Sequence, residues 1–175
     1  SEGGMESAFW AGKRTVNKPV RIKLWVELAA TSDDARQTSF DYDDDSTTYS
    51  YQIEIGLPKP DAAAFTLEPQ VKEETLLFHS GRRPLTILER RGPRAIAADE
   101  QGKKQTLGVD VLASETALGA IQDPARFPDV DVVRRTMLDW KFYHDFRSDR
   151  ASPLRQPCLA VTTPTLASGG SDLAA

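Results

Sequence analysis

Residues 20–28 read VRIKLWVEL, a run in which apolar positions alternate strictly with charged or aromatic ones. One face carries Val20, Ile22, Leu24, Val26 and Leu28, and the other carries Arg21, Lys23, Trp25 and Glu27. A period of two residues is that of a half-buried β-strand. Residues 49–57 (YSYQIEIGL) repeat the pattern with Tyr and Ile, which pack well on a pleated surface. The two runs therefore predict an antiparallel pair of strands.

The connection between these runs, residues 31–47, is polar and contains DYDDD at 41–45. It is long for a hairpin and too acidic to bury, so we expect a surface loop. Its carboxylates are dense enough to suggest calcium binding, but the run lacks the glycine and the terminal glutamate of an EF-hand loop. We interpret it as a solvated loop.

Downstream of LPKP at 57–60, short strand-like runs alternate with turn residues. Proline ends the second strand because it cannot donate to a ladder. The turns are predicted at Ser80-Gly81, at Gly92-Pro93 and around Gly102, and the strands at residues 65–71, 75–78, 85–90 and 94–98. This spacing predicts an antiparallel meander.

Helical signals follow the predicted meander. Ser114 is suited to cap a short helix over residues 115–122, because a hydroxyl accepts a free backbone N–H of the first turn. Asp123-Pro124 should end that helix.

A longer, aromatic-rich helix should begin at Pro128, with aspartates in its first turn, and run to about Phe146. Its apolar side chains form two stripes, so we expect cover on more than one side. Prolines beyond it leave room only for a short strand at 158–161. The expected fold class is α+β, with an antiparallel β-rich arm at 1–112 and a helical segment with a proline-rich loop at 113–175.

Composition limits the partners and the compartment. The chain has 26 acidic and 22 basic residues, so its overall field does not attract nucleic acid as a strongly basic domain would. Cys158 is the single cysteine, which excludes an internal disulfide and a cysteine-rich zinc site. No apolar run approaches the roughly 20 residues needed to span a bilayer, so we expect a cytoplasmic protein with no membrane partner.

Two stretches carry a resemblance to a known family. Residues 140–157 read WKFYHDFRSDRASPLRQP and are followed by TPTL at 163–166 and GSDLAA at 170–175. The second stretch is ETAL at 115–118 before DPARFP at 123–128. The residue order of both stretches resembles that of the predicted ABC-type ATPases related to SMC and RecF. Gly169 and Asp172 depart from that pattern, which tends to have Asp and Asn at these positions.

The resemblance implies that this chain is an internal part of an ABC-type P-loop NTPase lobe. It further implies a parent protein that binds ATP and Mg²⁺, forms a head-to-head homodimer, and acts in DNA repair or phage defence. The chain itself has no G-x-x-x-x-G-K-[ST] loop, no apolar strand ending in Asp-Glu and no signature motif. By resemblance, the phosphate loop lies before Ser1 and the other motifs after Ala175. We therefore expect no ATPase activity from this chain alone, and no catalytic residue or metal ligand within it.

Four residues are candidates for nucleotide contact. Arg147, Asp149 and Arg155 follow the predicted aromatic helix, and arginine donates in pairs to phosphate. Glu115 matches a glutamate of the resembled family, and the resemblance implies that Glu115 or Gln122 lies near the loop that senses nucleotide and magnesium. The structural alternative is that the first three residues bridge one another or cap carbonyls, and that Glu115 stabilises the first turn of its helix.

Other polar residues have stronger structural interpretations. Two histidines and the cysteine have no partner spacing for a metal or a nucleophile, namely His79, His144 and Cys158. A cluster of arginines near strand ends could contact a DNA backbone or simply balance nearby acids, namely Arg82, Arg83, Arg90, Arg91 and Arg94. This cluster supports the rival function, a free-standing β-rich DNA- or protein-binding module without a nucleotide role.

Overall fold

The computed structural model describes residues 21–29, 48–58, 67–80, 83–107, 111–142, 147, 149–152, 155–157 and 167. The chain divides into two compact units, Ser1–Arg135 and Thr136–Ala175, and each is described by itself. The predicted loop at 31–47 and the predicted strand at 158–161 lie outside the described residues.

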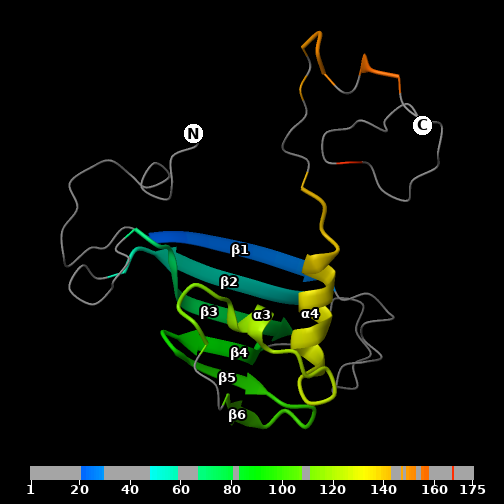
Figure 1. The fold of residues 1–175 in the computed structure, drawn as a ribbon. Helices are drawn as coiled ribbons and strands as arrows, with labels where there is room; N and C mark the ends of the chain where they lie inside the picture. The colour runs from blue at the N-terminus through cyan, green and yellow to red at the C-terminus, as the bar shows by residue number, and fades with distance from the viewer. Residues whose placement is uncertain are drawn as a thin grey trace. The chain divides into compact units, whose positions relative to one another are not determined.

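A six-stranded antiparallel sheet forms the first unit, with the strands in sequence order (Figure 1). The strands are β1 (Arg21–Ala29), β2 (Thr48–Gly56), β3 (Gln70–His79), β4 (Leu85–Arg91), β5 (Arg94–Ala98) and β6 (Lys104–Thr106). Two short helices follow, α3 (Ala117–Ala120) and α4 (Pro128–Leu138). The described residues therefore confirm the α+β class and the antiparallel meander.

The first two predicted strands pair as expected. β1 and β2 run antiparallel through all nine residues, with Trp25 opposite Gln52 and Val26 opposite Tyr51. The pairing has no bulge, because each strand keeps its alternation without an inserted residue. β1 is nevertheless more exposed than a half-buried strand, since Leu24 keeps 51% of its surface and Trp25 keeps 68%.

The third strand differs from the prediction. Residues 65–71 and 75–78 were expected to be separate strands, but β3 runs unbroken from Gln70 to His79. The charged run Lys72-Glu73-Glu74 falls between those two predicted ranges. It belongs to the strand because β2 bonds it on one side, with an irregularity at Glu54, and the side chain of Glu74 points into the core.

Two glycines explain the tight turns after β4 and β5. β4 and β5 are joined by the two-residue loop Gly92-Pro93, in which Gly92 has a φ of 61°. Glycine adopts this conformation without a steric cost, and a glycine at the first loop position is typical of a two-residue hairpin. Gly102, with a φ of 74°, serves the turn between β5 and β6, where Asp99 Oδ1 accepts the backbone N–H of Lys103.

The core lies between the sheet and the helical segment. Tyr51 on β2 opposes Leu76 on β3, and Leu76 opposes Leu88 on β4, so these side chains share one face. Figure 1 shows α3 and the first turns of α4 in front of this face. Buried apolar residues of the strands and helices complete the core, including Tyr49, Phe78, Ile87, Ala97, Leu118, Val130 and Val133. We call the face of the sheet that carries Tyr51, Leu76 and Leu88 the helix-covered face.

Both predicted helices are present, but each is shorter than expected. α3 covers Ala117–Ala120 instead of 115–122, and Thr116 caps it in place of Ser114. Thr116 has an extended backbone, and its Oγ1 accepts the N–H of Gly119 at 3.0 Å. That geometry is required of an N-cap residue.

The second helix begins at Pro128 as predicted, and acidic residues stand in its first turn. The expectation that it continues to Phe146 is wrong over the described residues, because α4 ends at Leu138 and residues 139–142 are not helical. The N–H of Trp140 bonds the carbonyl of Met137, a three-residue turn that closes the helix. Leu138 and Phe142 are exposed.

Candidate functional site

Three ionisable side chains meet in the centre of the helix-covered face. Glu74 on β3 stands opposite Arg90 on β4, and each is only 1% exposed. Tyr51 on β2 lies beside them and donates its hydroxyl to Glu74 Oε1 at 2.9 Å. Since neighbouring strands bring opposite residues onto one face, the register itself assembles this group. We call it the buried triad.

The carboxylate of the triad holds the start of α3. Glu74 Oε2 accepts the backbone N–H of Ala117 at 2.6 Å, and Oε1 accepts that of Leu118 at 2.8 Å. The first N–H groups of a helix have no partner within the helix, and they carry partial positive charge. Glu74 satisfies two of these donors from a strand that lies more than forty residues earlier in the chain.

The guanidinium of the triad holds the chain just before α3. Arg90 donates from Nη2 to the carbonyl of Leu112 at 2.8 Å and from Nη1 to the carbonyl of Glu115. Its Nε donates to the carbonyl of Gly92 at 2.7 Å. Arg90 Nη1 also lies 3.9 Å from Glu74 Oε2. The two charges therefore compensate each other while both bind the backbone around α3.

Burial changes the protonation chemistry of the triad. Burial, followed by the negative charge of Glu74, raises the pKa of the Tyr51 hydroxyl far above its ordinary value, so Tyr51 remains a hydrogen-bond donor. Burial also lowers the pKa of Arg90, while the charge of Glu74 acts in the opposite direction. Arginine titrates so far above neutral pH that Arg90 stays charged. The triad is thus a fixed donor and acceptor set, which suits an anchor better than an acid-base catalyst.

Three further carboxylates are buried among the described residues of the first unit, those of Glu54, Asp129 and Asp131. Glu54 is 4% exposed and pairs with Arg21 and Lys23 across the β1–β2 ladder. Burial alone would raise the pKa of Glu54, but the hydrogen bonds from both cations outweigh it and lower that pKa. This pairing fixes β1 to the rest of the sheet on the face away from the helices.

Asp129, in the first turn of α4, is 1% exposed. Its Oδ1 accepts the hydroxyl of Tyr49 at 2.7 Å, whereas its Oδ2 has no hydrogen-bond partner in the described part of the chain. Burial raises the pKa of Asp129, and the bond from Tyr49 offsets only part of that rise. The contact ties α4 to β2.

The structure places Glu115 outside the first turn of its helix. α3 has no acidic residue in its first turn, and the Glu115 side chain is exposed while its backbone carbonyl is held by Arg90. The suggestion that Glu115 stabilises this helix through its charge is therefore wrong, and Glu74 occupies that role. Glu115 and Gln122 do share the lining of a small surface hollow of about 280 Å³ beside α3.

The other three candidates belong to the second unit. Arg147 binds Asp149 through Nε and Nη2, both at 2.9 Å from Oδ2. Asp149 Oδ1 accepts the N–H of Ala151, and the buried hydroxyl of Ser152 donates to the carbonyl of Arg147. The backbone N–H of Arg155 bonds the carbonyl of Ser152. Arg147 and Asp149 are brought together in a local turn, as the structural alternative expected.

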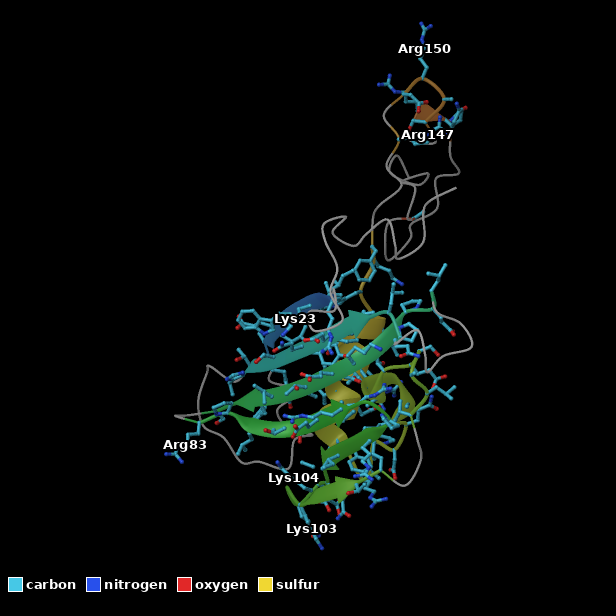
Figure 2. The ribbon with its side chains drawn as sticks, turned by 90° about the vertical axis from the view of Figure 1, so that its left-hand side faces the viewer. Lys23, Arg83, Lys103, Lys104, Arg147 and Arg150 are labelled. Atoms are coloured by element: carbon cyan, nitrogen blue, oxygen red, sulfur yellow. The ribbon has the colours of Figure 1, made fainter. Side chains whose placement is uncertain are left out.

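The predicted arginine cluster is not one surface. Arg90 is a core residue, and Arg91 pairs with Glu89 at 3.0 Å. Arg83 and Arg94 are exposed, but they lie beyond opposite ends of β4, whose seven residues span roughly 23 Å. Figure 2 shows Arg83 at a different corner of the sheet from Lys103 and Lys104. Arg82 lies outside the described residues.

The remaining polar candidates have structural roles or are not described. His79, at the end of β3, is hydrogen-bonded to Ser50 on β2. His144, Cys158 and the acidic run at 41–45 lie outside the described residues. Within the described ranges, no group of three or more His, Cys, Asp or Glu side chains could hold a metal ion.

A hollow of the first unit lies between the β5–β6 turn and α4. It has a volume of about 560 Å³ and is lined by polar residues that include Glu100, Asp131 and Arg135. Asp131 is already paired with Arg134 and Arg135, so its carboxylate is occupied. The described residues that line it include no serine, cysteine or histidine.

Comparisons with protein-family models, with curated proteins and with solved structures each returned no match. None of the helices in the described portion has the length and apolar character required to cross a membrane. Sequence reasoning missed the buried triad. One signal could have found it, because Glu74 is in phase with Leu76 and Phe78, and Arg90 is in phase with Leu88.

Proposed function

We propose that this chain is the β-arm and following helical segment of an ABC-type P-loop ATPase lobe, and that the parent protein binds ATP and Mg²⁺ and hydrolyses ATP. The resemblance in residues 140–157 and in residues 115–128 carries the proposal. The proposed parent is a cytoplasmic head-to-head homodimer that acts in DNA repair or phage defence. This chain frames the nucleotide lobe and does not catalyse.

The triad supports the framing role. It fastens the ETAL segment, residues 115–118, to the middle of the sheet through the backbone of Glu115, Ala117 and Leu118. A segment held by a buried carboxylate and a buried guanidinium keeps one position, which is what a nucleotide lobe needs from the elements around its ligand. The side chains of Glu115 and Gln122 then face solvent beside α3.

The test compares two chains. Residues 1–175 alone should neither bind nor hydrolyse ATP in the presence of Mg²⁺, whereas a chain extended on both sides with its natural flanking sequence should do both. Isothermal titration measures ATP binding, and phosphate release measures turnover. A folded, extended chain that shows neither binding nor turnover would refute the proposal.

A pair of variants of the extended chain tests the candidate site. Arg147→Ala should reduce ATP turnover if the Arg147 guanidinium meets phosphate, while Arg150→Ala, at an exposed position of the same turn, should not. Both variants are compared by circular dichroism, since Arg147 also pairs with Asp149. Equal turnover in the two variants would remove Arg147 from the site.

The rival function is a free-standing binding module. Its DNA form is weakened by the structure of the first unit, because Arg90 is buried and Arg91 is paired with Glu89. Salt-dependent DNA binding by this chain, reduced by Arg83→Ala and Arg94→Ala, would favour it over the ATPase proposal. Its protein-binding form has a specific observation behind it, which concerns the outer edge of β1.

A further inference from the structure

The outer edge of β1 is an unusual sheet edge. β1 is nine residues long, contains no proline and pairs with β2 without a bulge. Proteins normally protect such edges by making them short, charged, bulged or covered, because free backbone N–H and C=O groups attract another strand. β6, the opposite edge strand, is only three residues long. Among the described residues, no strand pairs with the outer edge of β1.

Exposed apolar side chains stand on both faces of this edge. Leu24, on the helix-covered face, is 51% exposed, and Trp25, on the opposite face, is 68% exposed. An added strand would cover both at once, since its alternate side chains lie beside them. The edge does not repel a second strand either, because Glu54 pairs with Arg21 and Lys23 from within the sheet and Glu27 adds a second negative charge on β1 itself.

The sequence of β1 is complementary to itself. When two copies run antiparallel with Trp25 at the centre, all nine residues overlap, and residues whose numbers sum to fifty face each other. Lys23 then opposes Glu27, and Trp25 opposes Trp25 of the other copy. On the helix-covered face, Ile22 meets Leu28 and Leu24 meets Val26. Each opposed pair is thus of opposite charge, aromatic or apolar, apart from Arg21 with Ala29.

We propose that β1 is a homodimerisation edge, through which two copies of this chain join their sheets in an antiparallel, two-fold symmetric pair centred on Trp25. Cross-strand pairs of these kinds stabilise a ladder, and like charges directly opposite each other destabilise it. A two-fold interface requires a surface that complements itself, as this register does. One strand pair is a small interface, so the dimer should form at micromolar concentrations.

The proposal is independent of the proposed ATPase role. The edge lies in the first unit and uses no nucleotide, whereas the head-to-head dimer of the parent protein is part of the proposed ATPase role. Self-association is therefore measured without nucleotide, on residues 1–175. ATP turnover of an extended chain and dimerisation through β1 can then fail or succeed separately.

Sedimentation velocity over a concentration series tests the dimer. Glu27→Lys places like charges opposite each other at two symmetric positions, and Trp25→Ser removes the central aromatic pair. Each should weaken dimerisation about tenfold or more. Glu68→Lys is the matched control, because it makes the same charge change at an exposed position outside β1 and should have no effect. Circular dichroism verifies that all variants are folded.

Cysteine cross-linking tests the register. In a Cys158→Ser background, an equal mixture of Lys23→Cys and Glu27→Cys chains should form a disulfide-linked dimer, because opposed residues bring their Cβ atoms to about 5 Å. Neither variant alone should form this disulfide, since its cysteine would lie four residues along the ladder from the equivalent cysteine of the other copy. A chain that stays monomeric throughout the series overturns the proposal. A dimer whose affinity is unchanged by Glu27→Lys and that gives no mixed cross-link also overturns the proposal, because that dimer uses another surface.

Discussion

Glu74→Gln changes one charge in the buried triad and almost no volume. The wild-type carboxylate accepts three hydrogen bonds, from Tyr51, Ala117 and Leu118, and lies 3.9 Å from Arg90. An amide has one acceptor oxygen, and its NH₂ group would face donors that it cannot satisfy. The buried guanidinium would also lose its counter-charge.

Removing one partner of a buried ion pair costs about 3–5 kcal/mol, because the other charge stays desolvated. Both side chains of this pair are fully buried, so the upper part of that range applies. Domains of this size are stable by about 5–15 kcal/mol, and the variant should therefore lose a large share of its stability. Glu73→Gln is the matched control, since Glu73 is the exposed neighbour on the same strand, and it should cost less than about 0.5 kcal/mol.

The assay is urea unfolding, followed by far-UV circular dichroism and by tryptophan fluorescence. Arg90→Met, measured alone and together with Glu74→Gln, completes a double-mutant cycle. The double variant should be about 1–3 kcal/mol more stable than the sum of the single effects predicts. If Glu74→Gln costs less than about 1 kcal/mol, or if the two changes are additive, the triad is not the anchor that we describe.

Three further predictions concern Tyr51 of the triad and the buried carboxylates of Glu54 and Asp129, and all use urea unfolding. Tyr51→Phe removes the hydroxyl bond to Glu74 and should cost about 1.5–3 kcal/mol, so an unchanged midpoint would argue against that bond. Glu54 has a lowered pKa in the folded chain, so its stabilisation is present above about pH 4.3 and is lost as pH falls through the folded pKa. The wild type should therefore lose its advantage over Glu54→Gln in acid, and a pH-independent difference would contradict this. Asp129 has a raised pKa, so its stabilisation is present in acid and lost as pH rises. Asp129→Asn should gain on the wild type between about pH 4 and about pH 7, and a relative loss over that range would contradict the sign.

Local pattern was sufficient for most of the sheet. The alternation in β1 and β2 predicted both strands and their antiparallel pairing, and Gly92-Pro93 marked the turn between β4 and β5. These signals are local, because the side-chain period of a strand and the torsion angles of a glycine turn depend on a few neighbouring residues. The start of α4 at Pro128 was predicted for the same reason.

The errors occurred where a charged residue is buried or an apolar one is exposed. β3 was predicted as two strands with Lys72-Glu73-Glu74 between them, and Glu74 is buried in the observed strand although glutamates normally stay at the surface. α4 was extended to Phe146 because its apolar stripe continues, yet Leu138 is the last helical residue and is 67% exposed. Hydrophobic periodicity describes which side chains could be buried, and it contains no information on whether a partner covers them.

The alternation of residues 20–28 thus determined a strand, and with it a sheet with two different faces. Only the tertiary structure decided that this strand is an edge strand, that Arg90 is buried, and that Glu74 binds the first N–H groups of α3. The physical reason is that these contacts join residues far apart in the sequence. Glu74 binds Ala117, 43 residues later, and Glu74 lies opposite Arg90 only because of the register between β3 and β4. A long-range contact of this kind depends on the whole chain path, whereas a two-residue period depends only on the backbone of the strand itself.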